Sequence, residues 1–366
     1  MFSSLSNRFQ QANSLLAPYA VMHGEGLGRV HAEEQDETRF PFQRDRDRII
    51  HTQAFRRLQH KTQVFAAGTG DHYRTRMTHT LEVAQISRDI ARTLSLNEDL
   101  AESVALAHDL GHTPFGHAGE EAMRSCMEPY GKSFEHNEQS LRIVTVLEDR
   151  SSQFPGLNLM REVHEGMMKH RTPHDYADGS AIPRAPTLEA QVVNLADEIA
   201  YTAHDTDDGL RAGVFTLGEL SALRLPAAAL SRAERRGTDI RGSLVTVLVT
   251  DLYQTSQALL EGQKILSLAD VYHCKSPLID FSAAMQEDLK ELRAFLWKRF
   301  YLSEKVTSQA QHGRETIAAL FEAYMQSPPP KVISLQQKTG GALEEAVKDY
   351  IAGMTDIFAL GARAEL

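Results

Sequence analysis

The sequence has 366 residues, 42% of them hydrophobic, which is enough apolar material for one large domain or two modest ones. A formal net charge of −10 argues against a protein that coats nucleic acid through a general basic surface, although a local cationic pocket is compatible with it. The two cysteines, Cys126 and Cys274, exclude a disulfide framework and favour a reducing compartment.

The first residues argue for a cytoplasmic protein. The opening MFSSLSNRFQQANSLLAPYA lacks a basic start, a sustained apolar stretch and a small-residue cleavage site. No apolar run in the chain approaches the length that spans a bilayer. We therefore expect cytoplasmic localisation and no membrane partner, and the charge disfavours a nucleic-acid partner.

Helical periodicity dominates the chain from about residue 76 onward, without a convincing set of alternating strands or an internal repeat. Long helices are predicted at 76–95, 98–110 and 188–208. Shorter amphipathic helices are predicted at 136–149, 242–262, 277–300, 313–326 and 341–359. Proline and glycine predict a loop at 171–187 and a stiff break at 328–330.

These patterns predict an all-α bundle with three parts. Weak periodicity in the first forty or so residues predicts an N-terminal arm at 1–43. We predict a catalytic core at 44–215. The remaining residues, 216–366, are predicted to form a C-terminal helical region that packs on this core, within a single structural unit.

The first long helix places a histidine at the end of an apolar face. Val83, Ile86, Ile90 and Leu94 fall at helical spacing and define an inward stripe. His79 stands four residues before Val83 and extends that stripe. The residue therefore points into the bundle.

The second long helix repeats the arrangement at its other end. Asn97 is expected to cap its start, and its inward stripe runs through Leu100 and Val104. His108 falls four residues after Val104, and Gly111 is expected to end the helix. A second imidazole is thus predicted at the end of a buried face.

The third long helix carries carboxylates on its inward face. It is expected to begin near Thr187 and has Val193, Asp197, Tyr201 and Asp205 at four-residue steps. A carboxylate within an inward stripe is costly unless it is paired or bound to a cation.

These side chains form a candidate metal site. The mixed nitrogen and oxygen set is His79, His108, Asp109 and Asp197. Such a set suits a divalent ion, namely Mn, Mg, Fe, Co, Ni or Zn. A bound ion would act as a Lewis acid and lower the pKa of a water molecule.

A structural alternative applies to each histidine, because a histidine on an apolar face is often only a hydrogen-bonded core residue. The chain also has three His-Asp doublets, at 108–109, 174–175 and 204–205. Only the first is joined to an upstream helical histidine and a downstream helical aspartate. The second is interpreted as solvated surface, and the third as functional through Asp205.

The segment after the first doublet concentrates further imidazoles beside acids. It reads HDLGHTPFGHAGEEAM and contains His112, His117, Glu120 and Glu121. Glu120 follows His117 by three residues and is close enough to orient its imidazole. A structural loop has little reason to gather these groups.

Several ordered motifs resemble the deoxyguanosinetriphosphate triphosphohydrolase family of HD-domain enzymes, in its shorter branch. They are DRDRIIHTQAFRRLQHKTQVF, RTRMTHTLEV, HDLGHTPFGHAGEEAM, FEHNEQS and NLADEIAYTAHDTDDGL. The resemblance covers roughly residues 44–212. It implies an HD-domain helical bundle with additional C-terminal helices and leaves the preferred base open.

The resemblance also implies residue roles. His79, His108, Asp109 and Asp197 would hold the metal, and His117 with Glu120 would be the catalytic pair. The substrate contacts would be Arg76, His112 and His136 at the phosphates and Gln63, Val64, Tyr201 and Asp205 at the deoxyribose, with Asp205 reading the 3′-hydroxyl. The implied partners are a deoxynucleoside triphosphate, an effector nucleotide and further copies of the chain, in a homo-oligomer such as a hexamer.

Each assigned contact has a structural alternative. Arg76 could be an exposed residue at a helix start, Tyr201 could be core packing, and His136 could be a cap. The alternating RDRDR at 44–48 is interpreted as a salt-bridged surface or subunit contact.

We expect hydrolysis of deoxynucleoside triphosphates to deoxynucleoside and tripolyphosphate. One alternative is an HD-type phosphohydrolase that acts on monophosphates or on phosphodiesters, including single-stranded DNA ends; the FEHNEQS motif with Tyr201 and Asp205 argues against it. Another is a non-catalytic nucleotide sensor, which would have no need of His117 and Glu120.

Overall fold

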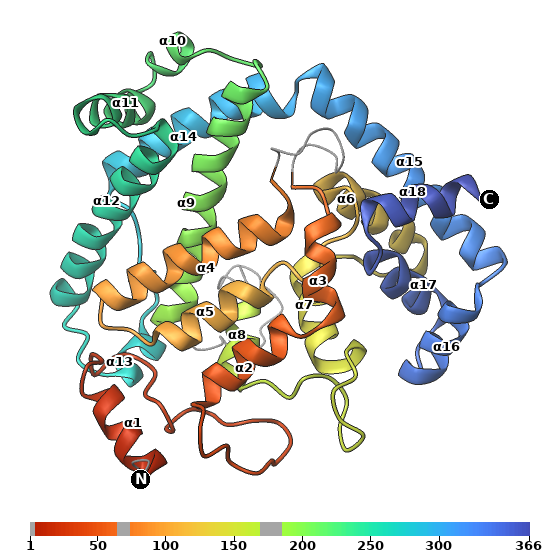
Figure 1. Cartoon of the computed structure of the whole chain (residues 1–366), viewed down its shortest axis with the longest axis horizontal. Coiled ribbons are helices and arrows are strands. Elements are labelled where there is room, and N and C mark those ends of the chain that lie inside the picture. Colours follow the sequence, from red (N-terminus) through yellow and green to blue (C-terminus); the bar gives the residue numbers. More distant parts are fainter. Residues whose placement is uncertain (1–3, 64–73, 169–184) are drawn as a thin grey trace.

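The protein is built from helices. A computed structural model describes residues 4–63, 74–168 and 185–366, and within these ranges the chain forms helices and no strand. In Figure 1, α4 (Arg76–Thr93) and α5 (Glu98–Ala107) lie side by side at the centre and α9 (Leu188–Arg211) crosses them. The predicted all-α class is confirmed. Across the described part of the chain, no helix is long and apolar enough to cross a membrane.

Further elements surround this centre. Those before α9 are α1 (Leu5–Asn13), α2 (Pro41–Ile50), α3 (Gln53–Arg57), η1 (Leu58–His60), α6 (Gly116–Met127), η2 (Glu128–Tyr130), α7 (His136–Arg142), η3 (Ile143–Leu147) and α8 (Arg161–Met167). Those after α9 are α10 (Leu217–Leu220), α11 (Arg224–Arg236), α12 (Ile240–Gly262), α13 (Leu268–His273), α14 (Ala283–Leu296), η5 (Trp297–Tyr301), α15 (Glu304–Gln326), α16 (Pro330–Thr339), α17 (Leu343–Ala352) and α18 (Asp356–Ala364).

The starts of the central helices follow from side-chain caps. The Asn97 side chain accepts a hydrogen bond from the Leu100 amide at 3.2 Å, and the Thr187 hydroxyl accepts one from the Ala190 amide at 3.3 Å. Each cap satisfies an amide that has no partner within its helix. Both predicted starts are therefore confirmed.

The predicted helix ends were less accurate. The helix predicted at 98–110 ends at Ala107, because the chain turns at His108 and redirects the next side chains. The region predicted at 341–359 forms two helices, α17 and α18, separated at 353–355. The proline break at 328–330 is confirmed as the junction where α15 ends and α16 begins.

Two hydrophobic cores hold these helices. The larger one joins α4, α5 and α9 to α2, α12 and α14. The smaller one joins α6 to α15, α16 and α17. Each fully buried aliphatic side chain contributes about 1.5–3 kcal/mol relative to exposure. The region after residue 215 therefore contributes to both cores. Helix α2 runs through the boundary predicted between residues 43 and 44. The division of the chain into three parts stays a prediction.

The RDRDR segment lies on α2, and its predicted surface position was partly wrong. Asp45 and Arg48 are buried. Asp45 pairs with Arg29 at 2.5 Å, and Arg48 pairs with Glu33 at 2.7 Å. These bridges attach the segment before α2 to the core, because a buried charge needs a charged partner.

The turn after α5 requires a glycine. A Cβ at Gly111 would overlap the Ser140 amide nitrogen and the His136 carbonyl oxygen, and it would lie 2.7 Å from the Gln139 carbonyl carbon. All three are backbone atoms of α7, so no side chain can move aside. Gly111 thus allows the turn at 108–112 to pack directly on α7.

We predict that Gly111→Ala lowers the free energy of unfolding by about 3 kcal/mol, the upper part of the usual range for overpacking. Urea denaturation measures this value. The control is Gly361→Ala within α18, where the added Cβ meets nothing within 4 Å. The control should be neutral or stabilising by up to about 1 kcal/mol, as expected for alanine in a helix. Equal stability of the two variants would contradict the close approach.

Candidate metal centre and its cavity

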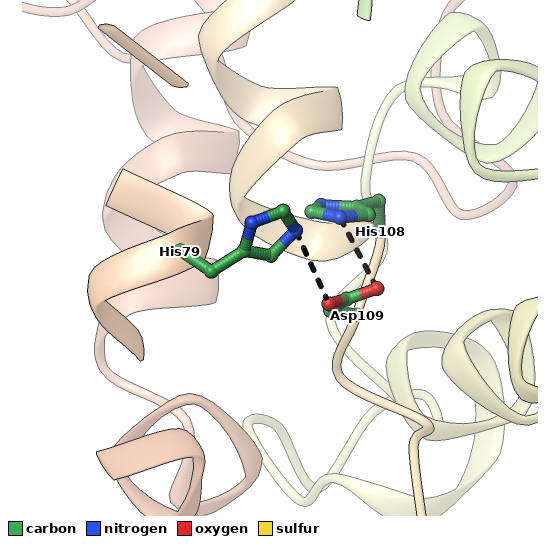
Figure 2. Close-up of side chains that lie close together, drawn as sticks. All are labelled: His79, His108 and Asp109. Carbon is green, nitrogen blue, oxygen red and sulfur yellow. Dashed lines mark ion pairs between the residues drawn. The ribbon is translucent and has the colours of Figure 1, made fainter. Parts of the chain in front are cut away.

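Three elements bring together the four predicted metal ligands. His79 lies in the first turn of α4, His108 and Asp109 directly follow α5, and Asp197 lies in the middle of α9. Nε2 of His79 is 3.0 Å from Oδ1 of Asp197 and 3.8 Å from Oδ2 of Asp109. Figure 2 shows the His79 and His108 rings both directed at the Asp109 carboxylate.

The donor atoms fit a cation. Nδ1 of His108 lies 2.6 Å from the Ala105 carbonyl oxygen, and a carbonyl can only accept, so Nδ1 carries the proton. The unprotonated Nε2 is buried, makes no hydrogen bond, and lies 3.1 Å from Oδ1 of Asp109 and 3.6 Å from Oδ1 of Asp197. A lone pair facing two carboxylate oxygens is repelled by them unless a positive ion lies between. His79, His108 and Asp109 could therefore hold a divalent ion, with Asp197 beside them.

Arg76 supplies fixed positive charge beside this cluster. Its Nη1 donates a hydrogen bond to Oδ2 of Asp109 at 2.9 Å, and only 2% of the residue is exposed. The alternative of an exposed residue at a helix start is therefore wrong. Burial raises the pKa of Asp109, but nearby positive charge, including the Arg76 guanidinium, outweighs it and holds that pKa well below its usual range. Asp109 is thus a carboxylate.

A second group of histidines adjoins the cluster. The His112 and His136 rings stack with centroids 3.9 Å apart. Oε1 of Glu120 accepts a hydrogen bond from the His136 amide at 3.0 Å and lies 3.0 Å from Nδ1 of its ring. Oε2 of Glu120 lies 3.6 Å from Nδ1 of His117. The contact predicted with His117 is therefore the longer of two, and the stronger anchor of Glu120 is His136.

The charge states of Glu120 and His112 follow from burial and from the groups around them. Burial raises the pKa of Glu120, but its contacts with His117 and His136 outweigh it and hold the pKa well below its usual range. Burial, together with the Arg76 guanidinium, lowers the pKa of His112 well below its usual value. Glu120 is therefore ionised and His112 is neutral. His117, in contrast, has 85% of its side chain exposed.

A cavity of about 760 Å³ adjoins both groups, within the size range of small-molecule sites. Of the predicted residues, its wall includes Gln63, Arg76, His79, Asp109, His112, His117, His136, Asp197, Tyr201 and Asp205. His108 and Glu120 are buried and do not line it. Val64 lies outside the described residues.

The cavity wall also includes residues that the sequence analysis did not assign. Trp297 and Tyr301 of the π-turn η5 line it, as do Val306 and Arg314 of α15. The Tyr301 hydroxyl donates a hydrogen bond to Oδ2 of Asp205. Short π-turns within helices are frequent at functional sites. The helices after residue 215 thus complete the cavity, a role that the sequence left open.

The C-terminal helices also hold the loop that carries His112. The Lys61 ammonium group donates hydrogen bonds to the carbonyl oxygens of His112 and Ala352. Asp356 accepts one from the Thr62 amide at 2.9 Å and one from the Phe115 amide at 3.0 Å. Phe115 has φ 64°, a left-handed conformation that costs roughly 1–3 kcal/mol and needs such support.

His204 is a further residue that the sequence analysis did not assign to the site. Its Nε2 lies 3.0 Å from Nδ1 of His79, and the residue is buried. The available signal was spacing, because His204 follows Asp197 by seven residues and shares its helix face.

Comparison with known proteins agrees with this arrangement. Residues 76–202 match the family described as HD domain, and residues 279–365 match the phosphohydrolase-associated domain. A deoxyguanosinetriphosphate triphosphohydrolase-like protein of Geobacter sulfurreducens is 46% identical over 359 residues, covering 94% of this chain and 93% of the relative. Proteins with the same description from Azoarcus sp. and Ralstonia nicotianae are 45% and 44% identical, each over 94% of this chain and over 94% and 92% of their own lengths.

We predict that Asp356→Ala destabilises the protein by roughly 1–3 kcal/mol for each buried amide that it leaves unpaired. Thermal and urea denaturation measure this loss. The matched control is Asp149→Ala, because Asp149 has 78% of its side chain exposed and pairs only at the surface, with Lys338. That change should lower the free energy of unfolding by about 0–1 kcal/mol, the usual contribution of an exposed ion pair. A loss in Asp356→Ala no larger than in the control would show that the C-terminal helices do not support the loop.

Proposed function

The chain belongs to the deoxyguanosinetriphosphate triphosphohydrolase-like family of HD-domain phosphohydrolases, and we propose that it hydrolyses deoxynucleoside triphosphates to deoxynucleoside and tripolyphosphate. The observation that carries the proposal is the composition of one cavity. Its wall includes three of the four proposed metal ligands and Arg76, and also Tyr201, Asp205 and Tyr301. A triphosphate and a sugar need these two sets of side chains.

His79, His108, Asp109 and Asp197 would hold a divalent ion. When bound, such an ion supplies a Lewis acid that activates water and polarises a phosphoryl oxygen. Its identity is open among Mn, Mg, Fe, Co, Ni and Zn, because all of them accept mixed nitrogen and oxygen ligands.

The neighbouring side chains would bind the phosphates and assist departure of the nucleoside. Arg76 is always protonated and neutralises charge on the phosphate oxygens, and His112 and His136 offer further ring N–H donors to them. His117 donates a proton to the 5′-oxygen that leaves with the nucleoside, and Glu120 helps to orient its ring. Attack of water at the α-phosphorus then releases the three phosphates together.

The second of these sets would select the sugar. Burial raises the pKa of Tyr201 and, with the Asp205 charge, that of Tyr301, so both phenols stay protonated and can donate hydrogen bonds. Asp205 accepts from Tyr301 and is proposed to accept from the 3′-hydroxyl as well. Gln63 packs near the sugar, and a close fit at C2′ would reject ribonucleotides.

We also propose that the protein forms a homo-oligomer and responds to an effector nucleotide. Exposed apolar side chains on α18 support association, because Ile357 and Phe358 are 62% and 50% exposed. A second copy would cover them.

We predict that the protein, supplied with Mn²⁺ or Mg²⁺, converts deoxynucleoside triphosphates to deoxynucleoside and intact tripolyphosphate. Each of the four substrates is tested alone and in mixtures, and ion-exchange chromatography identifies the phosphate product. Ribonucleoside triphosphates are the control and should react far more slowly. Release of pyrophosphate or single phosphate without tripolyphosphate, or hydrolysis of monophosphates alone, would contradict the proposed reaction.

We predict that Asp197→Asn weakens Mn²⁺ binding by more than roughly 100-fold, because loss of a direct ligand should exceed the effect of losing an outer partner. Isothermal titration calorimetry measures the affinity. Asp207→Asn is a matched control on the same helix, where Asp207 pairs with Arg211 at 2.9 Å. Its Mn²⁺ affinity should equal that of the unmodified protein. Equal weakening in both variants would point to general charge rather than to a defined ligand.

A further inference from the structure

His204 contacts Nδ1 of His79, a proposed metal ligand whose Nε2 faces Asp109 and Asp197. The residue lies on α9, and its ring meets the His79 ring edge-on, with an interplanar angle of 84°. Nε2 of His204 is 3.0 Å from Nδ1 of His79. His204 has no role in the proposed reaction. Its buried imidazole can nevertheless influence which nitrogen of His79 carries the proton.

The proton between the two rings decides whether His79 can bind a cation. A neutral imidazole carries one proton. If Nε2 of His79 presents a lone pair toward Asp109 and Asp197, the proton must sit on Nδ1, and it is then donated to Nε2 of His204. His204 must in turn carry its own proton on Nδ1, which lies 2.9 Å from Oδ1 of Asp205.

The Asp205 carboxylate favours this arrangement through charge. The contact with Nδ1 of His204 lies outside hydrogen-bond geometry, and neither atom has another hydrogen-bond partner. A negative oxygen at 2.9 Å nevertheless stabilises a protonated nitrogen over a lone pair, especially in a buried setting. The other oxygen of Asp205 accepts from Tyr301, which fixes the carboxylate in place.

The two metal-type histidines are therefore oriented by different means. Nδ1 of His108 faces the backbone carbonyl of Ala105, which can only accept. Nδ1 of His79 faces an imidazole nitrogen, which can accept or donate. On the other side of the ring, Oδ1 of Asp197 lies 3.0 Å from Nε2 of His79 and favours a proton there unless a cation lies between them. With a cation in place the proton belongs on Nδ1, and His204 must accept it, which requires the His204 tautomer that Asp205 favours.

A second metal site at His204, Asp205 and Asp208 is the competing interpretation, since ligand atoms of all three lie close together. A metal on Nδ1 of His204 would move the proton to Nε2, which would then donate to His79. Nε2 of His79 would become protonated and could no longer bind a cation. Arg74 also lies 3.1 Å from Asp208 and opposes a second positive charge. The two sites are mutually exclusive.

We infer that His204 is a positioning residue through which Asp205 fixes the metal-binding tautomer of His79, so that one chain of contacts, here called the relay, links the nucleoside end of the cavity to the metal centre. The inference rests on the proposed metal centre. Outer partners of metal-bound histidines set ring orientation and tautomer in this way.

Two variants test the relay. His204→Leu removes the acceptor while filling most of the space, and His204→Gln keeps a side-chain carbonyl that can accept from Nδ1 of His79. Calorimetry with Mn²⁺, in the absence of nucleotide, should show roughly 10–100-fold weaker binding for His204→Leu. His204→Gln should bind within a few-fold of the unmodified protein. Equal affinity of all three proteins would overturn the inference.

A measurement on the unmodified protein makes the test independent of variant folding. In ¹⁵N-labelled, Mg²⁺- or Zn²⁺-loaded protein, NMR two-bond correlations distinguish a proton on Nδ1 from one on Nε2. We expect His79 to carry its proton on Nδ1, and a proton on Nε2 would overturn the inference. If the unmodified protein binds no divalent ion, the metal centre itself fails; if it binds one and His204→Leu binds equally well, only the relay fails.

Discussion

The site depends on the convergence of two imidazoles and two carboxylates, of which only Asp197 is partly exposed, and these groups repel one another unless a cation lies between them. Nε2 of His108 lies 3.1 Å from an oxygen of Asp109 and 3.6 Å from an oxygen of Asp197 and makes no hydrogen bond. Arg76 offsets part of the negative charge, and a divalent ion would offset the rest. Because α4, α5 and α9 share one hydrophobic core, apolar packing supplies the free energy that holds this unfavourable set together.

The C-terminal helices support the loop that carries His112 and Phe115. Lys61 and Asp356 connect the segments before α4 and after α17 to the turn that carries His112 and Phe115. Figure 1 shows α15 to α18 gathered on one side of the molecule, beyond α6. The HD-domain region therefore supplies the proposed ligands, whereas the phosphohydrolase-associated region closes the cavity and holds its loop.

Sequence periodicity predicted what a single helix determines. The positions of His79, His108 and Asp197 at the ends or centre of apolar stripes followed from four-residue spacing, and the start of α5 followed from the capping preference of Asn97. Contacts between distant segments carry no such signal. The pairing of His204 with His79, the wall formed by Trp297, and the bonds of Asp356 depend on how helices cross. The buried bridge of Asp45 was missed for the same reason.

Anomalous X-ray diffraction at the manganese edge, on crystals grown with Mn²⁺, tests the central claim most directly. The account predicts one strong peak within bonding distance of Nε2 of His79, Nε2 of His108 and the carboxylates of Asp109 and Asp197. A peak at His204 and Asp208, or no peak near α4 and α9 at saturating Mn²⁺, would contradict it.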